Sequence, residues 1–237
     1  MNKKYLFLVS APHSGSTALY KILHTSPAIS TCISSSNPSH VGEGSALFHL
    51  RRDTLIEGWA DNRYSPEFKL PMQKAHDAYK KLWDPSKPIL CDKFTEAVHA
   101  PSYEHYFSQL GKVFFVLLTR DPYCYRHGVQ DWYFHNKTIA ELHNSLKNCL
   151  LLSYEDLVSD TRSARNRLLS FLPALQTLDV AVGKIKNLKG GSTTDPLHGP
   201  LENLNTPRNV ESKNRDLDRA PHIVEVMKYL NYFPKGD

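Results

Sequence analysis

The stretch that decides the fold is YLFLVSAPHSGST, residues 5–17. Residues 5–10 are apolar without alternation, which is typical of a strand buried on both faces of a sheet. A small-residue turn follows, and a pattern of helical period runs over 16–25. This arrangement favours anion binding, because the first helical turn has free N–H groups and the positive end of the helix dipole. The alternative is an ordinary turn in which Ser14 or Ser16 caps the helix.

The rest of the chain continues the alternation of buried strands and helices. Further strands are predicted at 89–91, 113–119 and 149–153. Helices are predicted at 46–60, 67–83, 97–110, 123–134, 139–147, 161–172 and 221–230. This order predicts an α/β fold, a parallel sheet of four or five strands flanked by helices, related to P-loop folds. In such folds, ligands bind at the carboxyl ends of the strands.

Length and composition indicate one domain, residues 1–237. The chain is 41% apolar and long enough to bury a sizeable core. We place that core at 5–172. Residues 186–219 are punctuated by Gly and Pro and are predicted to be an irregular segment that covers a bound cofactor. A C-terminal helix is expected at 221–230.

Charge and cysteine content restrict the function further. The net charge of +5 is mild, so it suits an anionic ligand without indicating a nucleic-acid partner. No apolar run approaches the roughly 18 residues of a membrane span, and we interpret the start as a strand rather than a signal peptide. The four cysteines have no C-x-x-C spacing, which predicts buried reduced thiols, no metal site and a soluble, cytoplasmic protein. They are Cys32, Cys91, Cys124 and Cys149.

The turn after the first strand lacks the pattern of an ATP-binding P-loop, G-x-x-x-x-G-K-[ST], because Ser16 stands where the Lys belongs. It resembles instead the 5′-phosphosulfate loop of sulfotransferases, Pro-[Lys/Arg]-Ser-Gly-[Thr/Ser]-Thr. These enzymes use 3′-phosphoadenosine-5′-phosphosulfate (PAPS) and release adenosine 3′,5′-bisphosphate (PAP). The departure is His13, which carries only part of a charge near neutral pH. The resemblance assigns cofactor binding to His13, Ser14, Gly15, Ser16 and Thr17, and a catalytic role to His13 as well.

A second motif, Arg120-Asp121-Pro122, ends the strand at 113–119. It resembles the 3′-phosphate signature of sulfotransferases, which implies that Arg120 binds this phosphate by a charge-assisted pair. Pro122 is then expected to open a helix. The family often has a Ser eight residues after the Arg, and this chain has Gly128 there, whose backbone is still a candidate for cofactor contact. The alternative for Arg120 is a structural salt bridge.

Two further motifs match in the family's order. Asp92-Lys93 resembles the Asp/Asn-Lys signature of tyrosylprotein and carbohydrate sulfotransferases. It implies that Lys93 stabilises charge on the sulfuryl group, although a solvated Lys is the simpler alternative. Tyr154-Glu155-Asp156-Leu157 resembles a family motif whose Tyr lies near the adenine, and a structural Tyr at the sheet edge is equally compatible. A late basic loop implies cofactor contacts at Lys189, Gly190, Gly191 and Ser192.

The general base is predicted to be Glu43. It matches a Gly-Glu-Glu motif of the tyrosylprotein branch if about ten additional loop residues are allowed. The resemblance therefore implies transfer of a sulfuryl group from PAPS, without a metal, to a small-molecule, carbohydrate or peptide acceptor that carries a hydroxyl or amine. Two alternatives remain, a P-loop kinase and a non-catalytic nucleotide-binding module of sulfotransferase type.

Overall fold

The computed structural model describes residues 3–32, 62–178, 207 and 209–233. In this part of the chain a five-stranded sheet has the order β2-β3-β1-β4-β5, and each neighbouring pair is parallel. The strands are β1 (Lys4–Ser10), β2 (Ile29–Thr31), β3 (Ile89–Phe94), β4 (Lys112–Thr119) and β5 (Cys149–Ser153). The predicted α/β class with a parallel sheet is confirmed.

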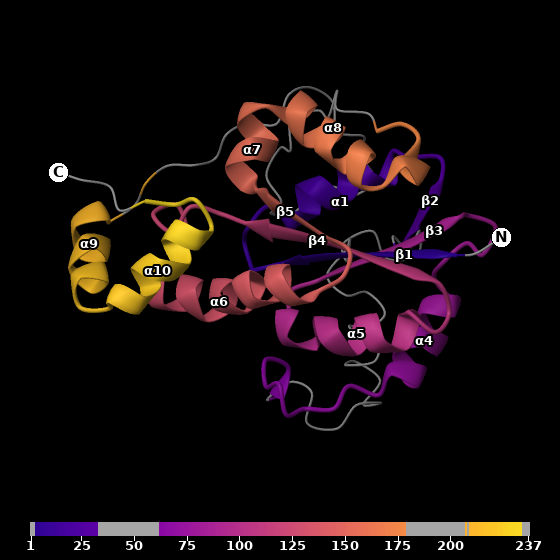
Figure 1. Cartoon of the computed structure of the whole chain (residues 1–237), viewed down its shortest axis with the longest axis horizontal. Coiled ribbons are helices and arrows are strands. Elements are labelled where there is room, and N and C mark those ends of the chain that lie inside the picture. The colour runs from indigo at the N-terminus through magenta and orange to yellow at the C-terminus, as the bar shows by residue number, and fades with distance from the viewer. Residues whose placement is uncertain (1–2, 33–61, 179–206, 208, 234–237) are drawn as a thin grey trace, which may run out of the picture.

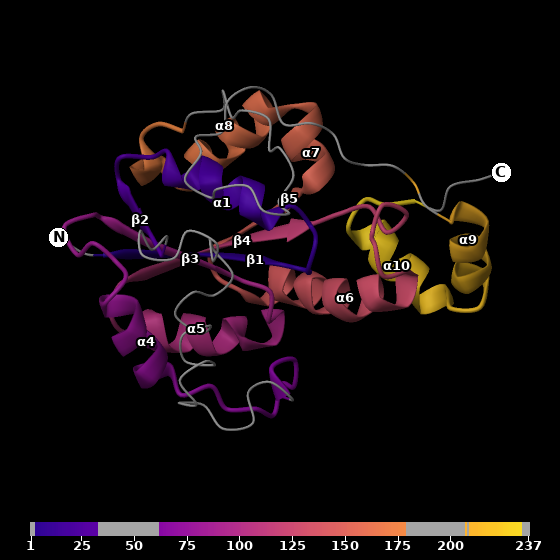
Figure 2. The ribbon, with the colours of Figure 1, turned by 180° about the vertical axis from the view of Figure 1, so that it is seen from behind.

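Helices cover both faces of the sheet, as Figures 1 and 2 show. One face carries α1 (Ser16–His24), α7 (Tyr154–Ser159) and α8 (Thr161–Phe171). The other carries α4 (Met72–Lys80), the 3₁₀ turn η2 (Ala97–His99), α5 (Ala100–Phe107) and α6 (Val129–Ser145). A second 3₁₀ turn, η3 (Pro173–Leu175), follows α8, while α9 (Val210–Asp218) and α10 (Pro221–Tyr229) pack beside α6.

The sheet separates two hydrophobic clusters, because successive side chains of a strand point to opposite faces. Tyr5, Phe7 and Val9 of β1 join a cluster with α4, α5, α6 and α10. Leu6 and Leu8 join the cluster with α1 and α8. The lack of alternation in β1 is therefore explained by burial on both faces of the sheet. This burial also fixes the position of the turn that follows β1.

Several element boundaries differ from the predictions. The short strand β2 was not predicted, since its three residues are too few for a recognisable pattern. The helices predicted at 123–134 and 139–147 form one helix, α6, which begins only at Val129. Helix α9 lies within the segment predicted to be irregular, 186–219. The helix predicted at 46–60 lies outside the described residues.

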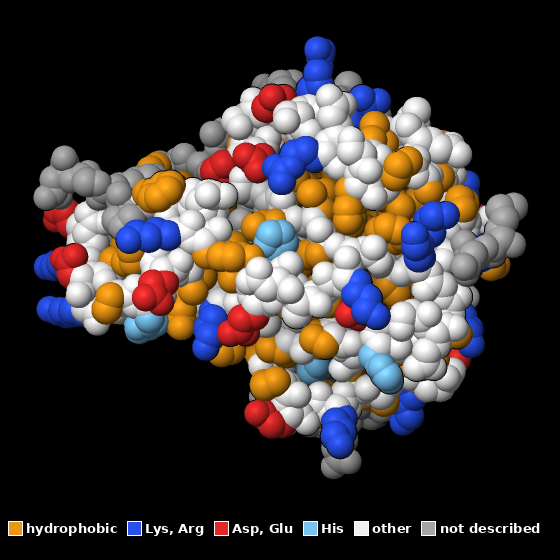
Figure 3. Space-filling view, viewed as in Figure 1, with side chains coloured by type: hydrophobic (Ala, Val, Ile, Leu, Met, Phe, Trp, Pro, Cys, Tyr) orange, Lys and Arg blue, Asp and Glu red, His pale blue; other side chains and the backbone are white. Residues whose placement is uncertain are grey.

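The surface and the thiols bear on the charge and cysteine predictions. On the face seen in Figure 3, Lys and Arg side chains alternate with Asp and Glu rather than forming one basic patch. All four cysteines are free, and three of them are buried, as predicted, while Cys149 is half-buried. No helix among the described residues is long and apolar enough to cross a membrane.

Candidate functional site

The His13 loop, residues 10–17, connects β1 to α1 and presents an uncapped helix terminus. Gly15 is the N-cap residue in the left-handed conformation, with φ 84°, and within the described part of the chain no capping side chain accepts a hydrogen bond from the first turn of α1. The alternative in which Ser14 or Ser16 caps the helix is therefore wrong. Because the first N–H groups of a helix have no partner within it, this terminus keeps donors for an anion.

Two residues of the loop have conformations or environments that need an explanation. His13 has φ 61°, which is unusual for a residue other than glycine, and its side chain is exposed. Ser14 is fully buried, and its Oγ has no hydrogen-bond partner among the described residues. A buried hydroxyl without a partner costs free energy. The loop thus contains a buried hydroxyl whose hydrogen bond the described residues do not supply.

Tyr154, the first residue of α7, packs directly against this loop. A Cβ added to Gly15 would overlap the Tyr154 ring, so the close approach of the two residues requires glycine as much as the positive φ does. Tyr154 is buried, with 5% of its surface exposed. The Tyr154 ring therefore packs against Gly15 and supports the His13 loop.

Lys93 lies near the end of β3, which pairs directly with β1. Its side chain is only 1% exposed, so it is not the solvated Lys of the simpler alternative. Its Nζ donates a hydrogen bond to Thr17 Oγ1 at 3.1 Å, in the first turn of α1. A buried ammonium is therefore held at the same helix terminus that presents the free N–H groups. Together they form an electropositive site.

The neighbouring Asp92 points to the opposite face of β3, toward Tyr79 and Tyr103. It is fully buried, and neither carboxylate oxygen makes a hydrogen bond of ordinary geometry with the described residues. Burial raises the pKa of this carboxyl from 3.8 to about 7, because desolvation outweighs the opposing effect of the Lys93 backbone N–H and the Lys93 charge. Only Lys93 of this motif therefore faces the His13 loop.

Arg120 joins the end of β4 to the His13 loop. Its Nη1 donates to the backbone oxygen of His13 at 3.0 Å, and its guanidinium carbon lies 4.4 Å from the centroid of the Tyr154 ring. The Arg120 carbonyl accepts a hydrogen bond from Trp132 Nε1 at 2.6 Å. Arg120 therefore lies beside the loop. The cation–π contact with Tyr154 orients its side chain, and the hydrogen bond from Trp132 fixes its backbone.

The segment after β4, residues 120–128, is called here the Arg120 turn. The prediction that Pro122 opens a helix is wrong. Asp121 Oδ1 accepts a hydrogen bond from the Tyr123 N–H at 2.7 Å and closes a turn instead. The helix begins after Gly128, which has φ 93°. A Cβ on Gly128 would meet nothing within 4 Å, so its backbone conformation alone accounts for glycine there.

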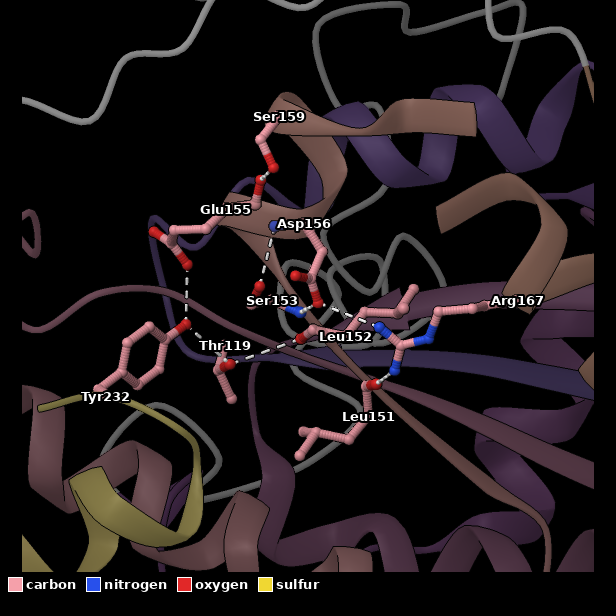
Figure 4. Close-up of polar contacts among 9 residues, drawn as sticks. All are labelled: Thr119, Leu151, Leu152, Ser153, Glu155, Asp156, Ser159, Arg167 and Tyr232. Carbon is pink, nitrogen blue, oxygen red and sulfur yellow. Dashed lines mark hydrogen bonds and ion pairs between the residues drawn. The ribbon is translucent and has the colours of Figure 1, made fainter. Parts of the chain in front are cut away.

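A polar network connects the Arg120 turn to α7, and Figure 4 shows the part of it formed by Glu155, Tyr232 and Thr119. Glu155 Oε1 accepts from the Asp121 N–H at 3.1 Å, and its Oε2 accepts from the Tyr232 hydroxyl at 2.8 Å. The same hydroxyl lies 3.1 Å from Thr119 Oγ1 at the end of β4. The Tyr-Glu-Asp-Leu motif therefore holds the site together through its Glu as well as its Tyr.

A cavity of about 410 Å³ opens beside the His13 loop. Its lining is polar and includes residues from the loop after β3, from α6 and from the segment before α4. These are Pro12, His13, Arg63, Tyr64, Thr95, Glu96, His127, Asp131 and His135. Burial lowers the pKa of His135 despite the nearby Asp131. The cavity provides room for a second ligand next to the anion site.

The predicted site residues are largely brought together. Most of them lie at the carboxyl ends of β1, β3, β4 and β5, namely the His13 loop, Lys93, Arg120 and Tyr154, and Gly128 ends the turn that begins with Arg120. Glu43 and residues 189–192 lie outside the described residues. Sequence reasoning missed Glu96, which lines the cavity and is 3% exposed. It lies in the loop directly after β3, three residues beyond Lys93, a spacing that could have drawn attention to it.

Comparisons with known proteins agree with this geometry at the level of the fold. No protein-family model matches the chain, and no curated protein matches its sequence. A sulfotransferase domain from the curacin biosynthetic pathway aligns over 98% of this chain and 99% of its own, with 16% identity and a TM-score of 0.52. A sulfotransferase from Alicyclobacillus acidocaldarius aligns over 98% and 97%, with 10% identity and a TM-score of 0.52. The chain therefore has a sulfotransferase-like fold.

Proposed function

We propose that the protein is a sulfotransferase that moves the sulfuryl group of PAPS to an acceptor hydroxyl or amine. The observation that carries this proposal is the buried Lys93 ammonium, held 3.1 Å from Thr17 Oγ1 at the uncapped N-terminus of α1. Such a cluster of donors suits the terminal group of a phosphosulfate.

The described residues fit PAPS at both of its anionic ends. The first N–H groups of α1 would bind the 5′-phosphosulfate, together with the Ser14 hydroxyl, which has no partner among the described residues. Arg120 would bind the 3′-phosphate from the neighbouring turn, with Gly128 and residues 189–192 as further candidate contacts. Tyr154 would set the height of the His13 loop and offer a ring edge to the adenine.

The proposed roles of Lys93 and His13 follow from the charge and the exposure of their side chains. PAPS, when bound, supplies the sulfuryl group and a good leaving phosphate. Lys93 would stabilise the negative charge that develops where the sulfuryl group departs, since a preorganised cation in a buried site acts strongly. His13 would add a hydrogen bond from the exposed side. Lys93 would then supply the positive charge that the family usually has at position 13.

The general base must take the proton of the attacking hydroxyl or amine. Glu43 stays our prediction. The cavity adds two carboxylates, Glu96 and Asp131, of which Glu96 is the more buried and lies in the loop after β3, close to Lys93 in the sequence. The polar lining of the cavity suits a hydroxyl-rich acceptor better than an apolar one.

Isothermal titration calorimetry with PAP tests the proposal. The sulfotransferase function predicts tight PAP binding without a metal, whereas a P-loop kinase would bind ATP with magnesium instead. Arg120→Ala is expected to weaken PAP binding by about tenfold or more, because it removes a charge-assisted pair. Arg162→Ala, an exposed Arg on α8, serves as the control and should leave the affinity unchanged. No PAP binding by the intact protein would refute the proposal.

Transfer of labelled sulfate from PAPS to a panel of sugars, phenols and peptides distinguishes an enzyme from a binding module. Lys93→Ala should abolish transfer, and Glu43→Gln should lower it by about 10²-fold or more if Glu43 is the base. Glu96→Gln is the parallel variant. Full activity in all three variants would contradict the assigned roles, and PAP binding without any transfer would favour the binding module.

A further inference from the structure

Helix α9 inserts a buried lysine into the back of the Arg120 turn. Lys213 is 5% exposed, and its Nζ donates to three backbone oxygens, those of Pro122 at 2.8 Å, Tyr123 at 2.7 Å and Tyr125 at 3.0 Å. A buried ammonium is costly unless it is well hydrogen-bonded, and three carbonyls at these distances satisfy all three of its donors. This lysine therefore occupies a cation site built from the main chain of the turn.

The two ends of the same turn contact the His13 loop. Arg120, at its start, donates to the His13 carbonyl at 3.0 Å. His127, near its end, places its ring 5.1 Å from the His13 ring. The three carbonyls that bind Lys213 lie between these residues in the sequence. Lys213 thus fixes the middle of a segment whose ends face the anion site.

Two further contacts attach the C-terminal segment to this region. The Tyr123 hydroxyl donates to Asn214 Oδ1 at 2.6 Å, next to Lys213. Tyr232, after α10, donates to Glu155, which in turn accepts from the Asp121 N–H. In Figure 1, α9 and α10 lie at the end of the molecule toward which β4 points. The C-terminal segment therefore contacts the turn directly from α9, and through Glu155 from Tyr232, which lies beyond the end of α10.

We infer that Lys213 is a positioning residue for the 3′-phosphate subsite. It sets the conformation of the Arg120 turn and, through it, the placement of the Arg120 guanidinium relative to the His13 loop. The inference rests on the proposed function, because it assigns the 3′-phosphate of PAP to Arg120. It gives α9 a role in ligand selection although α9 does not line the cavity described above.

The test compares two nucleotides that differ only in the 3′-phosphate, PAP and adenosine 5′-monophosphate. Dissociation constants are measured by calorimetry on the full chain. Lys213→Met should weaken PAP binding by about tenfold or more and leave the affinity for the monophosphate nearly unchanged, as Arg120→Ala should. In the double variant the two losses should not add, because both act on one contact.

Controls separate positioning from general stability. Leu168→Ala removes a buried side chain of α8 on the other face of the sheet and should lower the melting temperature without changing the ratio of the two affinities. Lys228→Met, an exposed lysine on α10, should change neither. If Lys213→Met does not fold, Tyr123→Phe removes the contact with Asn214 and should lower the same ratio to a smaller extent.

Each result decides between the claims. If the intact protein binds PAP no more tightly than the monophosphate, the proposed function fails first, and this inference fails with it. If Arg120→Ala loses the preference for PAP while Lys213→Met keeps it, the positioning role alone is overturned. Equal weakening of both nucleotides in Lys213→Met would also overturn it, since that indicates a structural effect. With Tyr123→Phe as substitute, an unchanged ratio has the same meaning.

Discussion

At the scale of single residues, β3 places two ionisable side chains of opposite sign, Asp92 and Lys93, on opposite faces of the sheet. Lys93 faces the helix terminus, whereas Asp92 is buried among Tyr79, Tyr103 and the hydrophobic cluster on the other face. A buried carboxyl without good hydrogen bonds favours its neutral form. The strand therefore keeps a cation at the site and a carboxyl that costs stability when it ionises.

This cost makes stability depend on pH. The Asp92 carboxyl has a pKa of about 7 in the folded protein and 3.8 as the unperturbed value. Between these values the folded state holds the proton that the unfolded state has lost, so stability falls as the pH rises toward 7 and stays low above it. Asp92→Asn should remove this slope. Relative to the wild type, the variant should gain about 2–3 kcal/mol on going from pH 5 to pH 8.

Urea denaturation at the two pH values measures the difference. Asp218→Asn, an exposed carboxyl on α9, is the matched control and should follow the wild type. Identical pH slopes for the wild type and Asp92→Asn would show that the Asp92 carboxyl ionises normally. The comparison of the wild type with Asp92→Asn requires that the neighbouring Lys93 keeps its contact with Thr17. Unchanged PAP binding by the variant would show that the anion site is intact.

At the scale of elements, the short helix α7 depends on its N-cap. The Ser153 hydroxyl accepts from the Asp156 N–H at 2.9 Å, and the Asp156 carboxylate accepts from the Ser153 N–H, which forms a capping box. Figure 4 also shows Arg167, which bonds Asp156 and the Leu151 carbonyl. Since α7 begins with Tyr154, the cap orients a residue that supports the His13 loop.

Ser153→Ala should cost about 1 kcal/mol of unfolding free energy, because it removes one of the two capping bonds. Thermal unfolding would then show a midpoint lower by roughly 2–4 °C. Ser159→Ala is the matched control, since the Ser159 hydroxyl only returns to the Glu155 carbonyl within the same helix. A smaller loss in Ser153→Ala than in Ser159→Ala would contradict the cap.

The elements also show what could be predicted from the sequence. β1 and the turn after it were predictable, because a strand buried on both faces and a small-residue turn are local patterns. The place of Arg120 directly after β4 was predictable for the same reason, whereas its role in binding a phosphate stays a prediction. The start of α6 was not, since the Asp121 side chain closes a turn that Pro122 alone does not indicate. Lys213 carries no local signal, because its partners lie about 90 residues earlier in the chain.

At the scale of the whole molecule, both hydrophobic clusters share the central strands of one sheet. β1 and β4 contribute alternate side chains to each cluster, and α10 packs into the same cluster as α4 and α5. Parts that share a core unfold together. The anion site is built from the His13 loop, the end of β3 and the Arg120 turn, so a ligand bound there should stabilise the entire fold rather than one segment.

PAP at about 100 times its dissociation constant should therefore stabilise the protein by about 2.7 kcal/mol. For a chain of this size, that shifts the melting temperature by roughly 5–10 °C. Scanning calorimetry should show one transition that moves as a whole, and the shift should be smaller in Arg120→Ala at the same PAP concentration. Two transitions, of which PAP moves only one, would show that the two clusters do not unfold as a unit. A larger shift with ATP and magnesium than with PAP would favour the kinase alternative, because only that function requires the metal–triphosphate complex.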